Sequence, residues 1–497
     1  MNQLATIYRI PLSLLTDLYQ LTMAYGYWKT GRAEESAVFH LFFRKPPFDA
    51  GYAVAAGLPQ VVDLLRTFRF EDSDLEYLAT LTGNDGERLF DPGFLDYLRR
   101  LELTCDVDAM PEGTVVFPSE PLVRVRGPML QAQLLESVLL NLVNFQTLIA
   151  TKAARVCQAA GDDAVLEFGL RRAQGIDGAL TASRAAYLGG CAATSNVLAG
   201  KLYGIPVKGT HAHSWVMAFD DEPAAFEAYA QAMPNNTVFL VDTYDTLDGV
   251  RNAIEAGRRL RDRGHAMVGI RLDSGDLAYL SIEARRLLDE AGFEDAVIVA
   301  SNDLDEYTIQ DLKRQGATIA VWGVGTKLVT AYDQPALGGV YKLGAIQGPQ
   351  GEWQHRIKLS EQVIKTSIPG VLQVKRYEDP RGHVADMIYD ELIGTGADRT
   401  IVDPRDPTRR KPIGPNCTER DLLVPVARQG EIVFKDEPLI AARDRARVEL
   451  AKVHPGTRRF LNPHEYPVGL EPQLHELRDR MIAQVRKVGS ETSEVRR

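Results

Sequence analysis

The sequence predicts an α/β protein whose central part is a parallel sheet or an α/β barrel. From residue 164 onward, short apolar segments recur about every 20 to 30 residues, and a helical pattern follows each of them. These segments do not alternate in polarity, which is expected of strands that are buried on both faces. Polar residues follow their C-terminal ends, and that end of the strands carries the functional residues in such barrels.

Length and composition are those of an ordinary globular protein. The chain has 497 residues, of which 45% are hydrophobic and 25% charged, enough for about two or three domains. The net charge of −10 gives no indication of nucleic-acid binding, although a local basic pocket for phosphate is compatible with it. The four cysteines form no Cys-x-x-Cys pair, which argues against structural zinc and a disulfide framework and fits a cytoplasmic location. We find no signal peptide, and no segment approaches the roughly 18 apolar residues of a membrane span.

Residues 1–160 are expected to form an N-terminal α/β domain. Apolar residues at helical spacing predict a helix over residues 12–28, and residues 36–43 have the composition of a strand. A longer apolar periodicity predicts a helix over residues 131–156. On periodicity alone, Tyr19 is a polar residue of an amphipathic helix with its hydroxyl group in water.

The central segment, residues 161–344, contains the repeated strand-and-helix pattern. Its expected strands are residues 164–168, 238–241, 266–270, 296–300 and 318–322, with a further one that ends at Val207. At or near their ends lie the polar residues His213, Asp242, Arg271, Asp273 and Asp303, and a loop that contains Gly323 and Gly325. An aspartate after a strand is often only the N-cap of the next helix, and we favour that interpretation for Asp303. The concurrence of polar residues at so many strand ends nevertheless favours a functional site.

One loop of this segment, residues 208–215, carries two histidines two residues apart. Gly209 allows a close approach of the backbone, and Thr210 adds a hydroxyl group. If the loop is extended, His211 and His213 point the same way. An exposed polar turn would explain a single histidine equally well, but the neighbouring strand ends favour function.

The residue types at these strand ends suit chemistry on a phosphorylated sugar. The run from Gly323 to Thr326 can offer backbone N–H groups and a hydroxyl to a phosphate. Arg271 provides a fork for a carboxylate or phosphate, and Asp273 an anion for Mg²⁺ or ribose hydroxyls, although a simple surface ion pair is the alternative. Phe168 is either a core residue or a platform for a flat ring. His213 could act as an acid or base, or as a nucleophile that takes a phosphoryl group.

After residue 350 the pattern becomes rich in β-structure. Residues 371–377 and 383–389 flank a turn sequence typical of a hairpin. Helices are expected over 437–453 and 471–487, and residues 441–497 are interpreted as a helical appendage on the surface, with a dimer contact as the alternative.

Several long blocks of the chain resemble nicotinate phosphoribosyltransferases, which are type II phosphoribosyltransferases. These blocks are LTDLYQLTMAYGYW (15–28), FRKPPF (43–48), EFGLRRAQGIDGALTASRAAYLGG (167–190), GTHAHSWVMAF (209–219), VDTYDTLDGVRNAI (241–254), RLDSGDL (271–277), ASNDLDEYTI (300–309) and GVGTKLVTAYDQPALGGVYKL (323–343). The resemblance implies an irregular, TIM-like α/β barrel over residues 161–344. A second α/β domain would combine residues 1–160 with a returning segment at about 345–440.

The resemblance also implies a reaction and a set of site residues. Nicotinate and 5-phosphoribosyl 1-pyrophosphate would give nicotinate mononucleotide and pyrophosphate, with ATP hydrolysed in the same process and Mg²⁺ required. The residue phosphorylated by ATP would be His213, whereas His211 has no implied role. The implied nicotinate contacts are Tyr19, Phe168, Thr210 and Arg271. Asp242 and Asp273 would hold His213, Mg²⁺ or the ribose. The implied contacts of phosphoribosyl pyrophosphate are Arg171, Gly323, Gly325 and Thr326. Tyr19 would come from a neighbouring subunit, so that a homodimer shares its active sites.

Two alternatives remain from the sequence. The first is a nicotinamide phosphoribosyltransferase of the same fold, which would need a carboxylate that accepts a hydrogen bond from an amide. Thr210 and Ser195, near the expected pocket, favour nicotinate instead. The second is a non-catalytic sensor of NAD metabolites, and the presence of His213, Arg271 and Asp273 argues against it.

Overall fold

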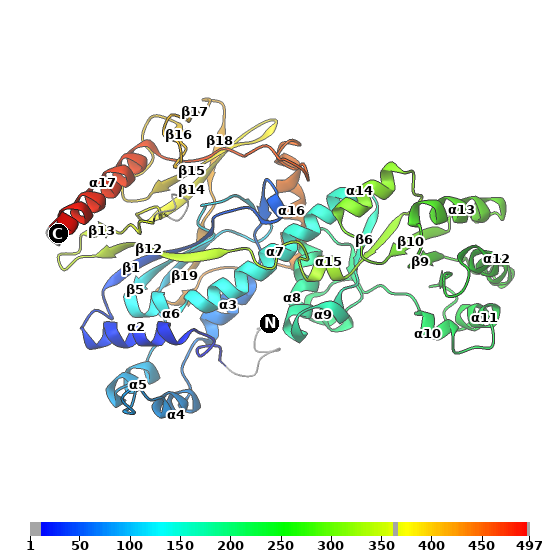
Figure 1. Cartoon of the computed structure of the whole chain (residues 1–497), viewed down its shortest axis with the longest axis horizontal. Helices are drawn as coiled ribbons and strands as arrows, with labels where there is room; N and C mark the ends of the chain where they lie inside the picture. The colour runs from blue at the N-terminus through cyan, green and yellow to red at the C-terminus, as the bar shows by residue number, and fades with distance from the viewer. Residues whose placement is uncertain (1–10, 361–365, 495–497) are drawn as a thin grey trace. The chain divides into compact units, whose positions relative to one another are not determined.

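The computed structural model (Figure 1) describes the backbone of residues 11–360 and 366–494. It describes the side chains of these residues up to residue 487. The chain divides into two compact units. Unit 1 consists of Met1–Leu148 and Ala336–Arg497, and unit 2 of Ile149–Pro335. The predicted central segment, residues 161–344, overlaps unit 2 but begins and ends later in the chain.

Unit 2 is built on a six-stranded parallel sheet in the order β7-β6-β11-β10-β9-β8. Its strands are β6 (Ala164–Glu167), β7 (Ala193–Thr194), β8 (Val238–Leu240), β9 (Gly269–Leu272), β10 (Val297–Ser301) and β11 (Val321–Val324). Its helices are η2 (Leu170–Arg172), α8 (Gly175–Leu188), α9 (Val197–Tyr203), α10 (His213–Val216), α11 (Glu222–Ala232), α12 (Thr246–Asp262), α13 (Leu277–Glu290), α14 (Glu306–Arg314) and α15 (Thr326–Val329). The prediction of a parallel α/β fold is confirmed.

The ladder of this sheet is open, and its two edges are β7 and β8. Residues 206–208 extend the β7 edge, because Thr194 N–H donates to Pro206 O and Lys208 N–H donates to Thr194 O, each at 3.0 Å. Among the described residues no backbone ladder joins this segment to β8. Closure into a barrel therefore stays a prediction.

Aspartate side chains are the N-caps of three consecutive helices of unit 2. Asp245 caps α12, Asp276 caps α13 and Asp305 caps α14, each by accepting hydrogen bonds from backbone N–H groups of the first turn. The prediction that Asp303 is the N-cap is therefore wrong by two residues. Asp303 lies in the preceding turn with φ of 42°, a left-handed conformation unusual for a residue other than glycine.

Unit 1 contains a seven-stranded antiparallel sheet in the order β13-β12-β1-β5-β3-β19-β20. It combines N-terminal strands with strands that return after residue 336, as the resemblance implied. Its strands are β1 (Ser36–Phe43), β3 (Asp106–Ala109), β5 (Val123–Pro128), β12 (Gly339–Gln347), β13 (Trp353–His355), β19 (Val424–Arg428) and β20 (Glu431–Ile432). Strands β2 (Ala53–Val54) and β4 (Val115–Val116) pair separately. The accompanying helices are α2 (Leu18–Lys29), η1 (Pro47–Asp49), α3 (Leu58–Thr67), α4 (Asp72–Thr80), α5 (Pro92–Arg99), α6 (Met129–Leu134) and α7 (Glu136–Ala160), the last of which continues into unit 2.

A second, six-stranded sheet of unit 1 has the order β17-β16-β21-β15-β14-β18. Its strands are β14 (Leu372–Asp379), β15 (Gly382–Asp390), β16 (Thr400–Val402), β17 (Arg410–Pro412), β18 (Thr418–Asp421) and β21 (Val468–Leu470), and the helices near it in sequence are α16 (Leu439–Lys452) and α17 (Pro472–Glu494). The predicted hairpin is the β14–β15 pair. Because β21 lies between β15 and β16, the segment interpreted as an appendage contributes a strand to this sheet, and its described residues, 441–494, belong to unit 1.

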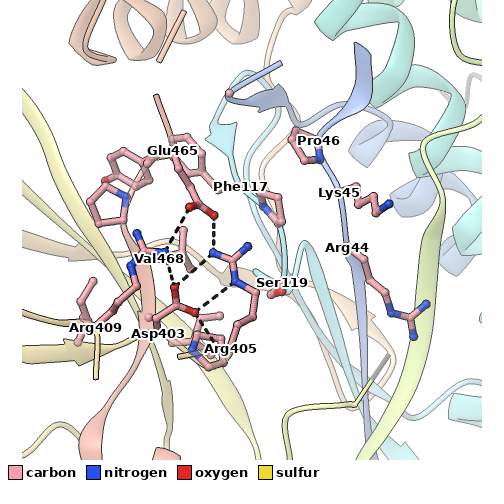
Figure 2. A pocket seen from close by; sticks show the side chains of 18 of the residues that line it. Arg44, Lys45, Pro46, Phe117, Ser119, Asp403, Arg405, Arg409, Glu465 and Val468 are labelled. Carbon is pink, nitrogen blue, oxygen red and sulfur yellow. Dashed lines mark hydrogen bonds and ion pairs between the residues drawn. The ribbon is translucent and has the colours of Figure 1, made fainter. Parts of the chain in front are cut away.

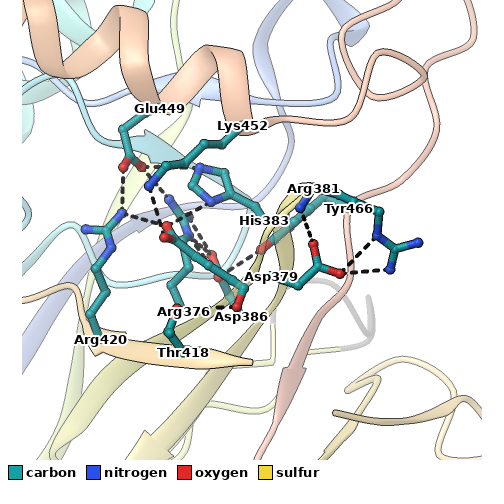
Figure 3. A network of polar contacts seen from close by, with 11 residues as sticks. Arg376, Asp379, Arg381, His383, Asp386, Thr418, Arg420, Glu449, Lys452 and Tyr466 are labelled. Carbon is teal, nitrogen blue, oxygen red and sulfur yellow. Dashed lines mark hydrogen bonds and ion pairs between the residues drawn. The ribbon is translucent and has the colours of Figure 1, made fainter. Parts of the chain in front are cut away.

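Buried charges connect this sheet to α16 (Figure 3). The Arg376 guanidinium lies 2.5 Å from Asp386 and 2.9 Å from Glu449. His383 lies 3.1 Å from Glu378 and 3.4 Å from Glu449. Such a network is stabilising only while each charge keeps its partner, because an unpaired buried charge is costly.

The described helices differ from membrane-spanning helices in length or hydrophobicity. None of them is both long enough and apolar enough to cross a bilayer.

Candidate active site

Arg271 is the centre of the polar cluster at the C-terminal end of the unit 2 sheet. Its Nε donates to Ser301 Oγ at 2.8 Å and its Nη1 to Thr210 Oγ1 at 3.1 Å. Its Nη2 lies 2.8 Å from Asp273 Oδ1. Three segments that are far apart in the sequence therefore meet at one guanidinium group, which is held in a fixed orientation with further N–H groups remaining for a ligand.

The His213 imidazole lies between the ends of β8 and β9. Its Nδ1 is 3.2 Å from Thr243 Oγ1. Its Nε2 is 3.7 Å from Asp273 Oδ2 and 4.0 Å from Asp242 Oδ1. The side chain is 39% exposed, so a ligand can reach a ring nitrogen that faces two carboxylates.

Asp242 is a buried carboxylate with one unsatisfied oxygen. Its Oδ2 accepts hydrogen bonds from the backbone N–H of Asp273 at 2.8 Å and from Ser274 Oγ at 2.6 Å. Its side chain is 1% exposed, and Oδ1 has no hydrogen-bond partner among the described residues. A buried acceptor without a donor is costly, and a cation or a protonated imidazole would satisfy it.

Asp273 remains ionised despite its partial burial. Burial raises the pKa of its carboxyl group, but hydrogen bonds from Ser301 and Arg271 outweigh this effect and lower the pKa below its ordinary value. Asp242 and Asp273 are thus two carboxylates on one side of His213, a donor set that suits Mg²⁺.

Phe168, directly after β6, packs closely against β11. The Arg271 guanidinium carbon lies 6.0 Å from the centre of the Phe168 ring. A Cβ atom at Gly323 would come within 2.7 Å of Phe168 Cδ2, so only glycine leaves room for this ring. Gly323 itself lies inside β11 and pairs with both β6 and β10. Packing is therefore one reason for a glycine here, while its predicted phosphate contact stays a prediction.

Three protein-family models together match most of the chain. The model described as nicotinate phosphoribosyltransferase (NAPRTase) N-terminal domain matches residues 14–144, the NAPRTase family model residues 164–367, and the NAPRTase C-terminal domain residues 373–478. The chain belongs to the nicotinate phosphoribosyltransferase family. It is accordingly an enzyme of the transferase class that serves NAD biosynthesis.

Relatives from distant organisms match this family member over nearly their whole length. The nicotinate phosphoribosyltransferase of Bacillus subtilis is 46% identical over 483 residues, which is 95% of this chain and 96% of that protein. The human enzyme is 38% identical over 534 residues, with 95% and 96% covered. The crystal structure of human nicotinic acid phosphoribosyltransferase matches with a TM-score of 0.81 at 35% identity, covering 94% of this chain and 99% of that one.

Four predicted site residues of this transferase lie outside the contacts described above. Arg171 is exposed in η2, and no described contact joins it to His213 or Arg271. Tyr19 lies on α2 of unit 1 and is 51% exposed. Thr326 is the first residue of α15, with Gly325 at its N-cap. Their roles as ligand contacts stay predictions.

Ser301 and Thr243 belong to the site but were not assigned from the sequence. Ser301 Oγ donates to Asp273 and accepts from Arg271, and Thr243 contacts His213. Both are hydroxyl residues at or just after strand ends, the same position that identified the charged residues. Their position at strand ends could have indicated them from the sequence, but serine and threonine are too common at strand ends for this to be specific.

Unit 1 contains a separate basic cavity of about 1010 Å³ (Figure 2). Arg405 and Arg409 on its wall are paired with Asp403 and Glu465. Its remaining cationic lining residues are Arg44, Lys45, Arg410, Lys411 and Arg478. A local basic pocket therefore exists in a chain of net negative charge.

Proposed function

We propose that this enzyme makes nicotinate mononucleotide from nicotinate and 5-phosphoribosyl 1-pyrophosphate, and that it couples this reaction to ATP through a phosphohistidine at His213. The observation that carries the proposal is the placement of His213 Nε2, on a side chain that is 39% exposed, opposite Asp242 and Asp273, 4.0 and 3.7 Å away. Family membership and the named relatives support nicotinate as the acceptor.

His213 has the geometry of a nucleophile. If Nδ1 keeps its proton and donates it to Thr243 Oγ1, the lone pair of Nε2 is free to attack the γ-phosphorus of ATP. The new N–P bond forms as the bond to the ADP oxygen breaks. Asp242 and Asp273 would hold Mg²⁺, which neutralises phosphate charge when it is bound.

In the glycosyl transfer step, the ring nitrogen of nicotinate bonds to C1 of the ribose as pyrophosphate leaves. We propose that Arg271 and Thr210 hold the carboxylate of nicotinate and that its ring stacks on Phe168. The ionised carboxylates of Asp242 and Asp273 would stabilise the positive charge that develops at C1. We assign the phosphate of the sugar to Gly323, Gly325, Thr326 and Arg171.

Tyr19 of the partner subunit would complete the ring pocket, which makes the functional form a homodimer. We also propose that unit 2 closes into the irregular barrel and that the protein works in the cytoplasm. The four cysteines are all free, which suits a reducing compartment.

The test is product formation with nicotinate or nicotinamide, each with and without ATP. We expect product from nicotinate but not from nicotinamide. The rate with nicotinate should be higher when ATP is present. Preference for nicotinamide would overturn the substrate assignment, and a rate independent of ATP would overturn the coupling. Binding of NAD metabolites without any product would indicate the sensor alternative.

A further inference from the structure

His211 is buried beside the active-site loop, and its ring orientation is defined by two hydrogen bonds. Its side chain is 7% exposed. Nε2 lies 3.2 Å from the backbone nitrogen of Leu240, which can only donate. Nε2 must therefore be the unprotonated acceptor, and Nδ1 carries the proton, directed at Ala212 O at 3.4 Å.

The surroundings of the ring keep His211 neutral. Tyr229 on α11 lies with its ring 4.7 Å away at a steep angle, and Phe226 lies at 6.2 Å. Burial lowers the pKa of His211 to about 4, and the charge of Arg271 acts in the same direction. At neutral pH Nε2 therefore stays available to accept a hydrogen bond.

Leu240 lies on the open edge of the sheet. The N–H of Val241 donates to Arg271 O on β9 at 3.2 Å, and successive N–H groups of a strand point to opposite sides. The N–H of Leu240 therefore points away from β9, where the next strand would pair. His211 Nε2 supplies the acceptor that this N–H lacks. His211 follows closely after residues 206–208, the segment that extends the β7 edge of the same sheet.

This contact joins the two segments that together hold His213. On one side, His211 is adjacent to Thr210 and two residues before His213 in the loop. On the other side, Leu240 is two residues before Asp242, and Thr243 follows. The distances from His213 to Thr243 and to Asp242 both depend on how this loop is placed against the end of β8.

We propose that His211 is a positioning residue that fixes His213 against Asp242 and Thr243, by using its side chain as the pairing partner that the edge strand β8 lacks. The role rests on the proposed function of His213 in ATP coupling. His211 itself takes no part in the chemistry, because Nε2 is occupied by Leu240 and the ring is buried.

Two substitutions, each of which can replace one of the two ring nitrogens, distinguish this positioning role from simple core packing. In His211→Gln, the side-chain carbonyl oxygen is as many bonds from Cα as Nε2 and can accept from Leu240. In His211→Asn the amide is one bond shorter, so it can replace Nδ1 but cannot reach Leu240. Both variants replace the ring with a polar amide, so loss of ring packing affects them alike.

The first measurement is nicotinate mononucleotide formation with and without ATP by wild type and both variants. We expect His211→Gln to keep its ATP stimulation, and His211→Asn to lose ATP-stimulated turnover on the order of 10- to 100-fold while basal turnover changes less. A purely structural role would lower both rates together in both variants. Equal ATP stimulation in all three proteins, or loss in His211→Gln as large as in His211→Asn, would overturn the proposal.

A second measurement does not depend on activity. The ¹⁵N spectrum of labelled wild-type histidine side chains should show His211 at neutral pH as the Nδ1–H tautomer, identified by the signal that disappears in His211→Gln. An Nε2–H tautomer or a charged ring would overturn the proposal even if the enzyme is active. If the wild type makes no product, the proposed function fails, and the tautomer still decides the geometry of His211. Should His211→Asn not fold, the comparison of His211→Gln with wild type remains decisive.

Discussion

Substitution of Gly323 by alanine tests the packing of Phe168 in the proposed nicotinate pocket. The added Cβ would lie 2.7 Å from Cδ2 and 2.8 Å from Cε2 of Phe168. Carbon atoms in ordinary contact are about 3.5–4.0 Å apart, so the ring must move by about 1 Å. A displacement of this size can cost up to roughly 100-fold in catalysis, and overpacking costs about 1–3 kcal/mol of stability.

The assay is the initial rate over a range of nicotinate concentrations at saturating phosphoribosyl pyrophosphate, together with the melting temperature. We expect kcat/KM for nicotinate to fall at least tenfold (about 1.4 kcal/mol). In a Phe168→Ala background the same substitution should cost much less, because the clash is gone. Equal losses in both backgrounds, or an unchanged kcat/KM for nicotinate, would refute the reasoning. A rise in KM for phosphoribosyl pyrophosphate alone would point instead to a phosphate contact at Gly323.

Three further predictions follow from the same contacts. Asp242→Asn removes the buried charge facing His213 and should lower turnover about 100-fold in a kcat measurement while the fold is kept; a change under threefold would contradict this role. Ser301→Ala removes a hydrogen bond that orients Arg271 and should raise KM for nicotinate roughly tenfold; an unchanged KM with lower kcat would contradict it. Burial lowers the pKa of His383, but the interactions with Glu378 and Glu449 outweigh burial and raise this pKa above its ordinary value. The protonated His383 therefore contributes its full stabilisation below pH 6.5, and this stabilisation is lost as the pH rises through the folded-state pKa. The melting temperature should therefore fall in a step above pH 6.5 that His383→Gln lacks, and an identical pH profile for both proteins would disprove it.

The sequence predicted the parallel fold of unit 2 well because its evidence is local. Each strand is an apolar run and each polar strand end is visible in the chain, so Asp242, Arg271, Asp273 and His213 could be expected to meet at one edge. The structure brings these four side chains together. The hairpin of β14 and β15 was equally visible, since its turn residues are specific.

Contacts between distant segments could not be predicted in the same way. The place of Ser301 beside Asp273 and of Leu240 beside His211 depends on the register of strands that are far apart in sequence. Strand β21 is only three residues long, too short for a periodic pattern, so its insertion between β15 and β16 left no signal. The N-cap of α14 was misplaced because Asp303 and Asp305 are both suitable residues and only the backbone conformation distinguishes them.

The central claim is that His213 carries the phosphoryl group, and labelling with [γ-³²P]ATP tests it most directly. Wild type should acquire a label that is stable in alkali and labile in acid, as expected of a phosphohistidine. The His213→Ala variant should acquire none while retaining basal synthesis of nicotinate mononucleotide. Label on His213→Ala, or no label on an active wild type, would contradict the account.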